Sequence, residues 1–198
     1  MISLPALPDG GHSFQILHCI MIAGMRSKVF LHRIQEKSME LQESGSSLAG
    51  ILRPFKKFMA ASGIKDTDQV AFYGCPGTCT PFIELLTYAA RDLPFEYIFV
   101  PRLDESSAKV LTPVPHVGMQ VTSHAPESFD PKIVVVMGGL AMPNETVTPE
   151  MVQETIGGYD AQIVGICFMD MFRRAGWDEK ISFDMVINAQ IDPVEVWK

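Results

Sequence analysis

The sequence predicts an α/β protein of three layers (α/β/α), in which helices cover both faces of a mostly parallel, doubly wound sheet. Strand-like and helix-like segments alternate along the chain from about residue 48 onwards. The strongest strand candidates are continuous runs of Val and Ile, which are typical of strands covered on both faces. Hydrophobic residues make up 47% of the chain and charged residues 20%, as in ordinary globular proteins. Together these observations favour a Rossmann- or flavodoxin-like sheet.

Each element follows from its own residue pattern. A helix over residues 48–62 places Pro54 in the first turn, where a missing N–H costs little. Thr80-Pro81 and Thr148-Pro149 each indicate a helix start, because a hydroxyl N-cap precedes a proline. The predicted helices are 48–62, 81–93, 149–156 and 170–175, and the predicted strands are 69–73, 97–100, 117–121 (the weakest), 133–137, 162–167 and 183–188.

The chain is expected to divide into an N-terminal extension, residues 1–46, and one domain, residues 47–198. Apolar residues at helical spacing predict an amphipathic helix over residues 12–42. Its apolar stretch, residues 14–25, is shorter than the ~20 residues that a bilayer span requires, so no transmembrane segment is expected. Three interpretations stay open. The helix packs on the domain or on a second copy in a homodimer, it lies on a membrane surface, or translation starts later, for example at Met39.

Charge and cysteine content exclude two classes of protein. The chain has 16 basic and 23 acidic residues, a net charge of −7, and the negative charge is concentrated beyond residue 38. A broad nucleic-acid surface needs excess positive charge, so no nucleic-acid partner is expected. Four cysteines are too few for a scaffold built on disulfides.

Two glycine-bearing loops, GCPGTCT (74–80) and GGLAMP (138–143), follow predicted strands. Ligands of open α/β sheets bind outside the carboxyl ends of the strands. The free N–H groups of a helix N-terminus favour anions, so we expect a small anionic ligand here. The first loop lacks the lysine of a Walker loop and the spacing of the dinucleotide fingerprint, and the alternative is that its glycines only permit tight turns. The expected ligand-binding residues are Gly74, Cys75, Gly77, Thr78, Cys79, Thr80, Gly138 and Gly139.

Three cysteines lie at predicted strand ends and form a second candidate site. Cys75 and Cys79 have C-x3-C spacing before a helix start, where the positive dipole end stabilises a thiolate. Two thiols cannot close a zinc site, but Cys167 offers a third ligand from a neighbouring loop. A thiol enzyme, a metal site or an iron–sulfur site with Cys75, Cys79 and Cys167 is therefore an alternative hypothesis. The alternative to a functional role is that these cysteines are small buried residues that only pack in the core.

The segment VGICF (164–168) lies between a predicted strand and a predicted helix. It resembles the strand–nucleophile–helix elbow of class I glutamine amidotransferases, and Gly138-Gly139 resembles the loop that gives those enzymes an oxyanion N–H. The resemblance implies that Cys167 is a catalytic nucleophile. The sequence departs from the pattern at Phe168 and Met169, where related enzymes have a histidine or a glycine, and it has no histidine after residue 124.

Other polar residues are weaker candidates. His116 and His124 flank the weakest predicted strand and are either a base or metal ligands, or surface residues. Glu84 either serves a site or complements the helix dipole, and Asp170 either serves a site or caps the helix 170–175. Asn188 and Asp192 also lie close to strand ends.

Four separated blocks, CTPFIELLTYAARDL (79–93), VVVMGGLAMP (134–143), VGICFMDMFRRAGW (164–177) and FDMVINAQIDPVEVW (183–197), resemble an archaeal family of unknown function that is typical of methanogens. The resemblance covers about residues 50–198 and implies a Rossmann-like fold in an anaerobic cytoplasm, where cysteines stay thiols or ligands. It transfers no catalytic residue and no cofactor. Three hypotheses result: binding of a small anionic ligand or cofactor, cysteine-based or metal chemistry, and an oligomeric interaction protein.

Overall fold

The computed structural model describes residues 39–198. Most of the predicted helix over residues 12–42, up to residue 38, lies outside the described residues. Residues 39–46 have no regular secondary structure, so the predicted C-terminal end of this helix is wrong. The helices are α2 (Ala49–Ala61), α3 (Thr80–Ala89), α4 (Pro149–Ile156) and α5 (Met171–Arg174), with two 3-10 turns, η1 (Glu105–Ser107) and η2 (Gly138–Ala141). The strands are β1 (Gln69–Gly74), β2 (Glu96–Pro101), β3 (Lys109–Val114), β4 (Gly118–Val121), β5 (Pro131–Met137), β6 (Gln162–Phe168) and β7 (Met185–Ala189).

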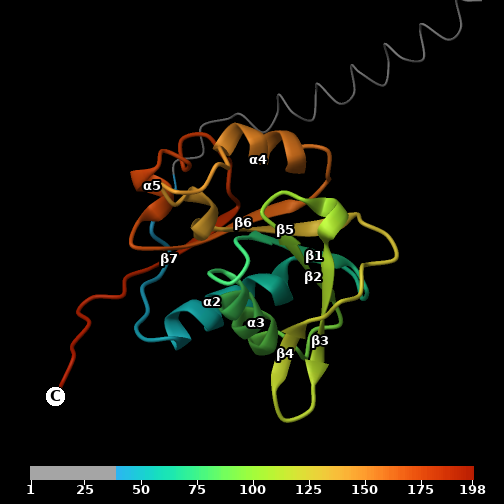
Figure 1. The fold of residues 1–198 in the computed structure, drawn as a ribbon, viewed down its shortest axis with the longest axis horizontal. Coiled ribbons are helices and arrows are strands. Elements are labelled where there is room, and N and C mark those ends of the chain that lie inside the picture. Colours follow the sequence, from blue (N-terminus) through green and yellow to red (C-terminus); the bar gives the residue numbers. More distant parts are fainter. Residues whose placement is uncertain (1–38) are drawn as a thin grey trace, which may run out of the picture. The chain divides into compact units, whose positions relative to one another are not determined.

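The described strands form one seven-stranded sheet with the order β4-β3-β2-β1-β5-β6-β7 (Figure 1). Strands β2, β1, β5, β6 and β7 are mutually parallel, which confirms the predicted mostly parallel sheet. Counted along the chain, these five strands have the order 2-1-3-4-5, which is the flavodoxin-like arrangement. The order reverses between β1 and β5, so the topological switch point of the sheet lies there.

Strand β3 was not predicted, because Pro113 interrupts its pattern and proline cannot donate to a sheet ladder. The pairing of β3 with β2 ends at Leu111, and Pro113 pairs only with Met119 of the edge strand β4. Because β2 does not pair with β3 at Pro113, the missing N–H of this proline leaves no strand hydrogen bond unmade. The two antiparallel strands form a hairpin that extends the sheet beyond β2 (Figure 1).

The helices lie on both faces of the sheet, which confirms the three predicted layers. Helices α2 and α3 cover one face, and α4 and α5 cover the other (Figure 1). On the first face, Phe55 of α2 packs on Phe72 of β1 with ring centroids 6.0 Å apart. On the second face, a Cβ atom at Gly165 would lie 2.9 Å from the ring of Phe172, so α5 approaches β6 closely only because this residue is glycine.

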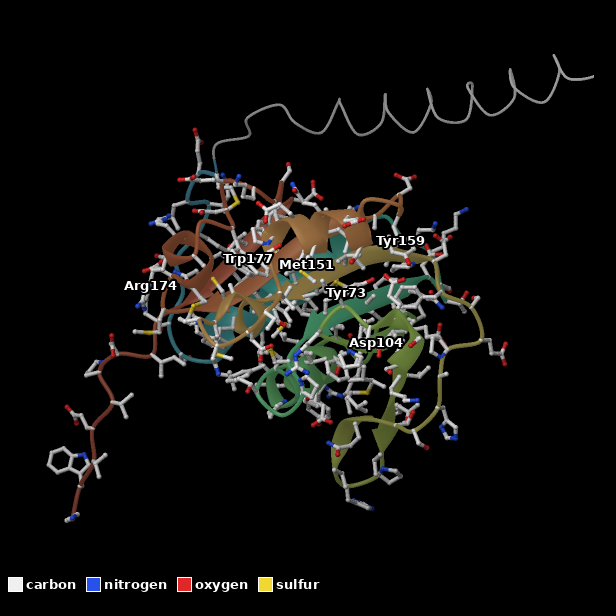
Figure 2. The ribbon with its side chains drawn as sticks, turned by 45° about the horizontal axis from the view of Figure 1, so that its top comes forward. Tyr73, Asp104, Met151, Tyr159, Arg174 and Trp177 are labelled. Atoms are coloured by element: carbon white, nitrogen blue, oxygen red, sulfur yellow. The ribbon has the colours of Figure 1, made fainter. Side chains whose placement is uncertain are left out.

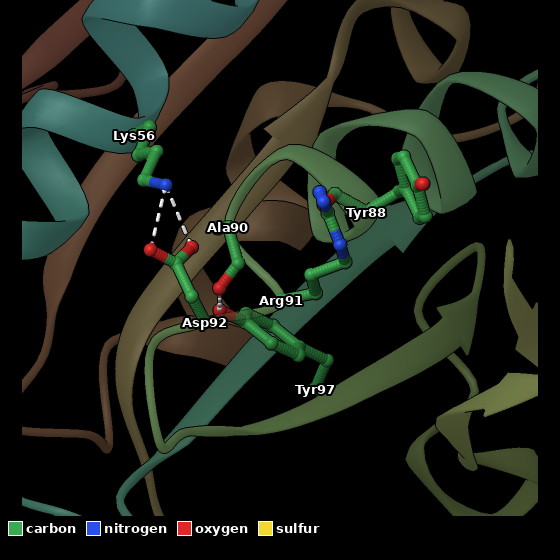
Figure 3. Close-up of polar contacts among 6 residues, drawn as sticks. All are labelled: Lys56, Tyr88, Ala90, Arg91, Asp92 and Tyr97. Carbon is green, nitrogen blue, oxygen red and sulfur yellow. Dashed lines mark hydrogen bonds and ion pairs between the residues drawn. The ribbon is translucent and has the colours of Figure 1, made fainter.

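The amino edge of the sheet holds contacts that fix the connection from α3 to β2 (Figure 3). Lys56 Nζ lies 2.6 Å and 2.8 Å from the carboxylate oxygens of Asp92. The hydroxyl of Tyr97 donates to the carbonyl oxygen of Ala90 over 2.8 Å. The ion pair is exposed and contributes little to stability, whereas the buried phenol ties the end of α3 to the start of β2.

Two helix starts differ from their predictions. Pro54 lies in the second turn of α2, not the first. Thr80 is the first residue of α3 and not its N-cap, and its Oγ1 accepts a hydrogen bond from the Gly77 N–H over 3.2 Å. Thr148 does cap α4, because its side chain accepts from Met151 N, as predicted. Helix α3 ends at Ala89, four residues before the predicted end.

Candidate functional site

The loop after β1 and the turn η2 after β5 meet at the switch point of the sheet. A Cβ atom at Gly139 of η2 would lie 2.4 Å from Sγ of Cys79 and 3.7 Å from Sγ of Cys75. The two loops predicted to form the site are thus in contact. In flavodoxin-like folds this position, outside the carboxyl ends of the strands, is where ligands bind.

The glycines of these loops have a packing reason. A Cβ atom at Gly74 would lie 2.8 Å from Cβ of Cys79, and one at Gly138 would lie 2.4 Å from Cβ of Cys167. Ordinary side chains cannot approach so closely, so glycine at 74, 138 and 139 makes room for cysteine side chains. Gly77 differs, because its φ is +80° and a Cβ there would meet nothing within 4 Å. It serves the tight turn, as the alternative interpretation proposed.

The structure brings Cys75 and Cys79 together. Both are buried and both are free thiols. Burial raises the pKa of Cys75 to about 12, and the neighbouring Cys79 and Glu145 act in the same direction. Burial also raises the pKa of Cys79, although hydrogen bonds from Cys75 and Gly139 oppose it. Burial therefore favours the neutral thiol form of both cysteines.

Cys167 lies within β6 and is 2% exposed. Its Sγ lies 3.4 Å from Oδ1 of Asn188, and burial raises the pKa of the thiol. A nucleophile elbow holds its nucleophile on a strained turn, but the left-handed residues here are Met169 and Asp170, with φ of 54° and 57°. The environment of Cys167 is thus that of a buried strand residue.

The two histidines within residues 39–198 lie in the β3–β4 hairpin and after β4, at the far edge of the sheet from β6. His116 is in the hairpin turn and His124 follows the edge strand; both are exposed. They are therefore surface residues and do not reach the cysteines. Within the same residues, no group of three or more His, Cys, Asp or Glu side chains has a geometry that would hold a metal ion. The metal-ligand prediction for Cys75, Cys79 and Cys167 gains no support from this arrangement.

Arg102 and Glu145 are charged residues of the site that the sequence did not single out. Arg102 follows β2 in a left-handed conformation with φ of 54°, and its backbone N–H donates to the Gly74 carbonyl oxygen over 2.8 Å. Its Nε lies 2.9 Å from Oε2 of Glu145, in the loop between η2 and α4. This contact lowers the pKa of Glu145, and the nearby carboxylate adds to the burial that raises the pKa of Cys75. No spacing in the sequence relates these two residues, so only the fold reveals the pair.

A second polar cluster lies beside the switch point on the face covered by α4 and α5. The buried Tyr73 donates to Oε1 of Glu105 over 2.7 Å, and Tyr159 donates to Oε2 over 2.9 Å. Asp104, which caps η1, directly precedes Glu105, whose carboxylate accepts from both phenols (Figure 2). Burial, followed by the bond to Glu105, raises the pKa of both phenols. The cluster ties the ends of β1, β2 and α4 together.

The remaining sequence candidates have structural partners. Glu84 accepts from the N–H of Val121 over 3.2 Å, so it attaches α3 to the edge strand β4. Asp170 occupies the predicted N-cap position of α5, but its side chain makes no capping hydrogen bond to the helix. Its carboxylate accepts instead from Nδ2 of Asn188 over 2.5 Å and from Nε2 of Gln190 over 2.9 Å. Asp170 and Asn188 therefore bind each other across the strand ends of β6 and β7.

Comparisons with known proteins agree with this fold. A family model described as "Uncharacterized protein conserved in archaea (DUF2124)" matches residues 46–192. An uncharacterised protein of Methanothermobacter thermautotrophicus is 41% identical over 65% of this chain and 83% of its own length. A second, from Methanocaldococcus jannaschii, is 35% identical over 78% of this chain and 92% of its own length.

Among solved structures, a crystal structure of a protein of unknown function from Methanothermobacter thermautotrophicus is similar. Its TM-score is 0.67 at 32% identity, and the match covers 81% of this chain and 99% of the other. These matches do not support the looser likeness to glutamine amidotransferases. Within residues 39–198, no helix has the length and apolar character that crossing a membrane would require.

Proposed function

The chain belongs to the archaeal family described as uncharacterised (DUF2124), and we propose that it binds a small anionic molecule at the switch point between β1 and β5. The observation that carries this proposal is Arg102. Its side chain is 52% exposed and lies next to the loop that leads into α3. A phosphate or carboxylate group at this place would meet a fixed cation beside a helix N-terminus, and each of these attracts anions.

The loop itself supports the same ligand class. Pro76, Gly77 and Thr78 are exposed, and the Thr78 N–H has no hydrogen-bond partner among residues 39–198. Glu145 is the anion that pairs with Arg102. A ligand anion would compete with this carboxylate for the guanidinium of Arg102, because both carry negative charge. The proposal includes a cytoplasmic location, which the resemblance to the methanogen family implies.

Removal of the cation should weaken binding. In titration calorimetry with inorganic phosphate, nucleotides and small carboxylates, Arg102→Gln should bind about tenfold or more weakly than the native chain, since a hydrogen bond to a charged group contributes about 1.5–3 kcal/mol. Glu145→Gln should bind more tightly than the native chain, because the competing carboxylate is gone.

Arg91→Gln is the matched control. Arg91 lies over the ring of Tyr88, 4.0 Å from its centroid, near the end of α3 that is far from the proposed site (Figure 3). Its removal changes the net charge by the same amount and should leave affinity unchanged. If none of the anions binds the native chain, or if both arginine variants lose affinity equally, the proposal is wrong.

A homodimer is a second proposal, and the C-terminal arm favours it. Residues 190–198 continue from the edge strand β7, and Val194, Val196 and Trp197 are 71%, 84% and 86% exposed. Large apolar side chains with so little cover are typical of contact surfaces. The N-terminal helix that was expected to make such a contact lies outside the described residues.

Charged substitutions in the arm should therefore dissociate the dimer. Val196→Asp and Trp197→Asp should each convert a dimer of the native chain into a monomer in sedimentation equilibrium. Met151→Asp, at an apolar residue of α4 that is 45% exposed, should leave the mass unchanged. A native chain that is already a monomer would contradict the proposal.

A further inference from the structure

The two edge strands of the sheet differ in how their outer backbone groups are satisfied. At the β4 edge, the Val121 N–H donates to Oε1 of Glu84 over 3.2 Å, and Oε2 of the same carboxylate accepts from Nε2 of Gln120 over 3.1 Å. A helix side chain that covers an edge in this way hinders pairing with another chain. Within residues 39–198, the β7 edge has no comparable hydrogen bond.

Strand β7 pairs with β6 on one side only. The backbone of Ala189 faces β6, because its carbonyl oxygen accepts from the Met169 N–H over 2.9 Å. Backbone groups alternate along a strand, so those of Val186 and Asn188 face outward. The strand sequence, MVINA, contains neither a charged residue nor a proline, which are the usual means of protecting an edge. This edge is therefore open to an additional strand.

The C-terminal arm, residues 190–198, has the properties of such a strand. It leaves the carboxyl end of β7 and runs away from the domain (Figure 1). Val194 and Val196 are 71% and 84% exposed; both are β-branched, and in an extended chain they lie on the same face. Residues 194–198 are as long as β7, which has five residues. The arm is thus long enough to pair with a whole strand of this length.

Charge favours a second copy of this chain as the partner. The arm carries two exposed acidic residues, Asp192 and Glu195. Helix α5, which connects β6 to β7, carries the exposed Arg173 and Arg174, and Arg174 has no ion-pair partner among residues 39–198. Arg174 lies on the side of the domain from which the arm leaves (Figure 2). In a chain of net charge −7, this basic pair beside β7 complements an acidic arm.

We propose that the C-terminal arm of each copy pairs with β7 of a second copy and adds one strand to its seven-stranded sheet. The inference rests on the homodimer proposed above and names the surface that the arm occupies. A twofold axis reverses the direction of the second copy, so an arm that continues from β7 lies antiparallel to the β7 that it joins. The outward backbone groups of Val186 and Asn188 gain partners, and the exposed valines of the arm leave water.

Proline at position 186 tests this pairing, with Val186→Ala as the matched control. Proline removes the outward N–H and its ring obstructs a neighbouring strand, but the bonds to β6 remain, since an edge strand tolerates proline where its N–H faces solvent. In sedimentation equilibrium, Val186→Pro should dimerise about tenfold or more weakly than the native chain, whereas Val186→Ala should match it. Equal dimerisation of the two variants, both folded by circular dichroism, would overturn the proposal.

Hydrogen exchange of the native chain does not depend on whether the variants fold. With mass spectrometry as the readout, peptides that cover β7 and residues 194–198 should exchange more slowly at concentrations where the chain is a dimer than where it is a monomer. A peptide that covers β4 should exchange equally at both.

The outcomes separate this inference from the homodimer itself. A dimer without added protection of β7 would overturn the inference and leave the homodimer intact. Protection of β7 and the arm in a monomer would show that the arm folds back on its own strand, which also overturns it. A native chain that is a monomer at every concentration would contradict both proposals.

Discussion

The free energy of unfolding should fall steeply in alkaline solution, by at least about 3 kcal/mol between pH 9 and 11.5. Burial raises the pKa of three tyrosines and three cysteines in the folded protein, namely Tyr73, Tyr97, Tyr159, Cys75, Cys79 and Cys167. A group whose pKa is raised by folding stabilises the folded state below its unfolded pKa. That stability is lost as the pH rises, because only the unfolded chain releases the proton.

The loss should have two onsets. It begins near pH 8.5, where unfolded cysteine ionises, and becomes steeper near pH 10, where unfolded tyrosine ionises. A fully buried group such as Tyr73 contributes up to about 1.4 kcal/mol for each pH unit, and the partly exposed Tyr159 contributes less because solvent screens it.

Urea unfolding at a series of pH values measures this effect. The fluorescence of the buried Trp177 is a suitable signal once the exposed Trp197 has been replaced by Phe. In Tyr73→Phe, the slope above pH 10 should be smaller, while the slope between pH 8.5 and 10 should be unchanged. A free energy of unfolding that stays constant up to pH 11 would contradict the proposed burial of these groups.

Gly138→Ala should destabilise the protein by about 3 kcal/mol, which is the upper end of the usual cost of overpacking. The added Cβ would lie 2.4 Å from Cβ and 2.8 Å from Cα of Cys167. Because the Cα belongs to the backbone of β6, no rotation of a side chain relieves the clash, and η2 or β6 must shift. Since η2 carries Gly139, the same shift should also disturb the contact with Cys79.

Gly158→Ala is the matched control for this substitution. Gly158 lies in the exposed turn after α4, and a Cβ there would meet no atom within 4 Å. Its effect on the free energy of unfolding should stay within about 0.5 kcal/mol. Equal stabilities of the two variants in urea unfolding would show that the turn η2 is not packed against β6 in solution.

Much of the fold could be predicted because its main signals are local. The run IVVVM (133–137) lies in a strand with both faces covered, and such runs are typical of strands in parallel sheets. Pro149 after Thr148 determines where α4 begins. Strand β3 could not be predicted, because only its one-sided pairing at Pro113 permits a proline there, and pairing is not visible in the chain.

The sequence predicted which two loops meet, but not how their residues pair. The loops after β1 and β5 were expected to meet because the carboxyl ends of parallel strands share one edge. Their glycines and cysteines were interpreted separately, whereas the structure pairs them, with Gly139 against Cys79 and Gly138 against Cys167. The resemblance to amidotransferases implied that Cys167 is a nucleophile, whereas the structure places it as a buried residue of β6.

The sequence by itself determined the α/β class, the parallel sheet and the edge at which a site can lie, since these depend on hydrophobic runs and helix starts. Only the tertiary structure decided which charged residues lie beside these loops. Arg102 and Glu145 are 43 residues apart, and Tyr73 and Tyr159 share Glu105 from three separate segments. Such contacts depend on how strands are ordered in the sheet, and strand order is set by packing of the whole domain, not by any local pattern.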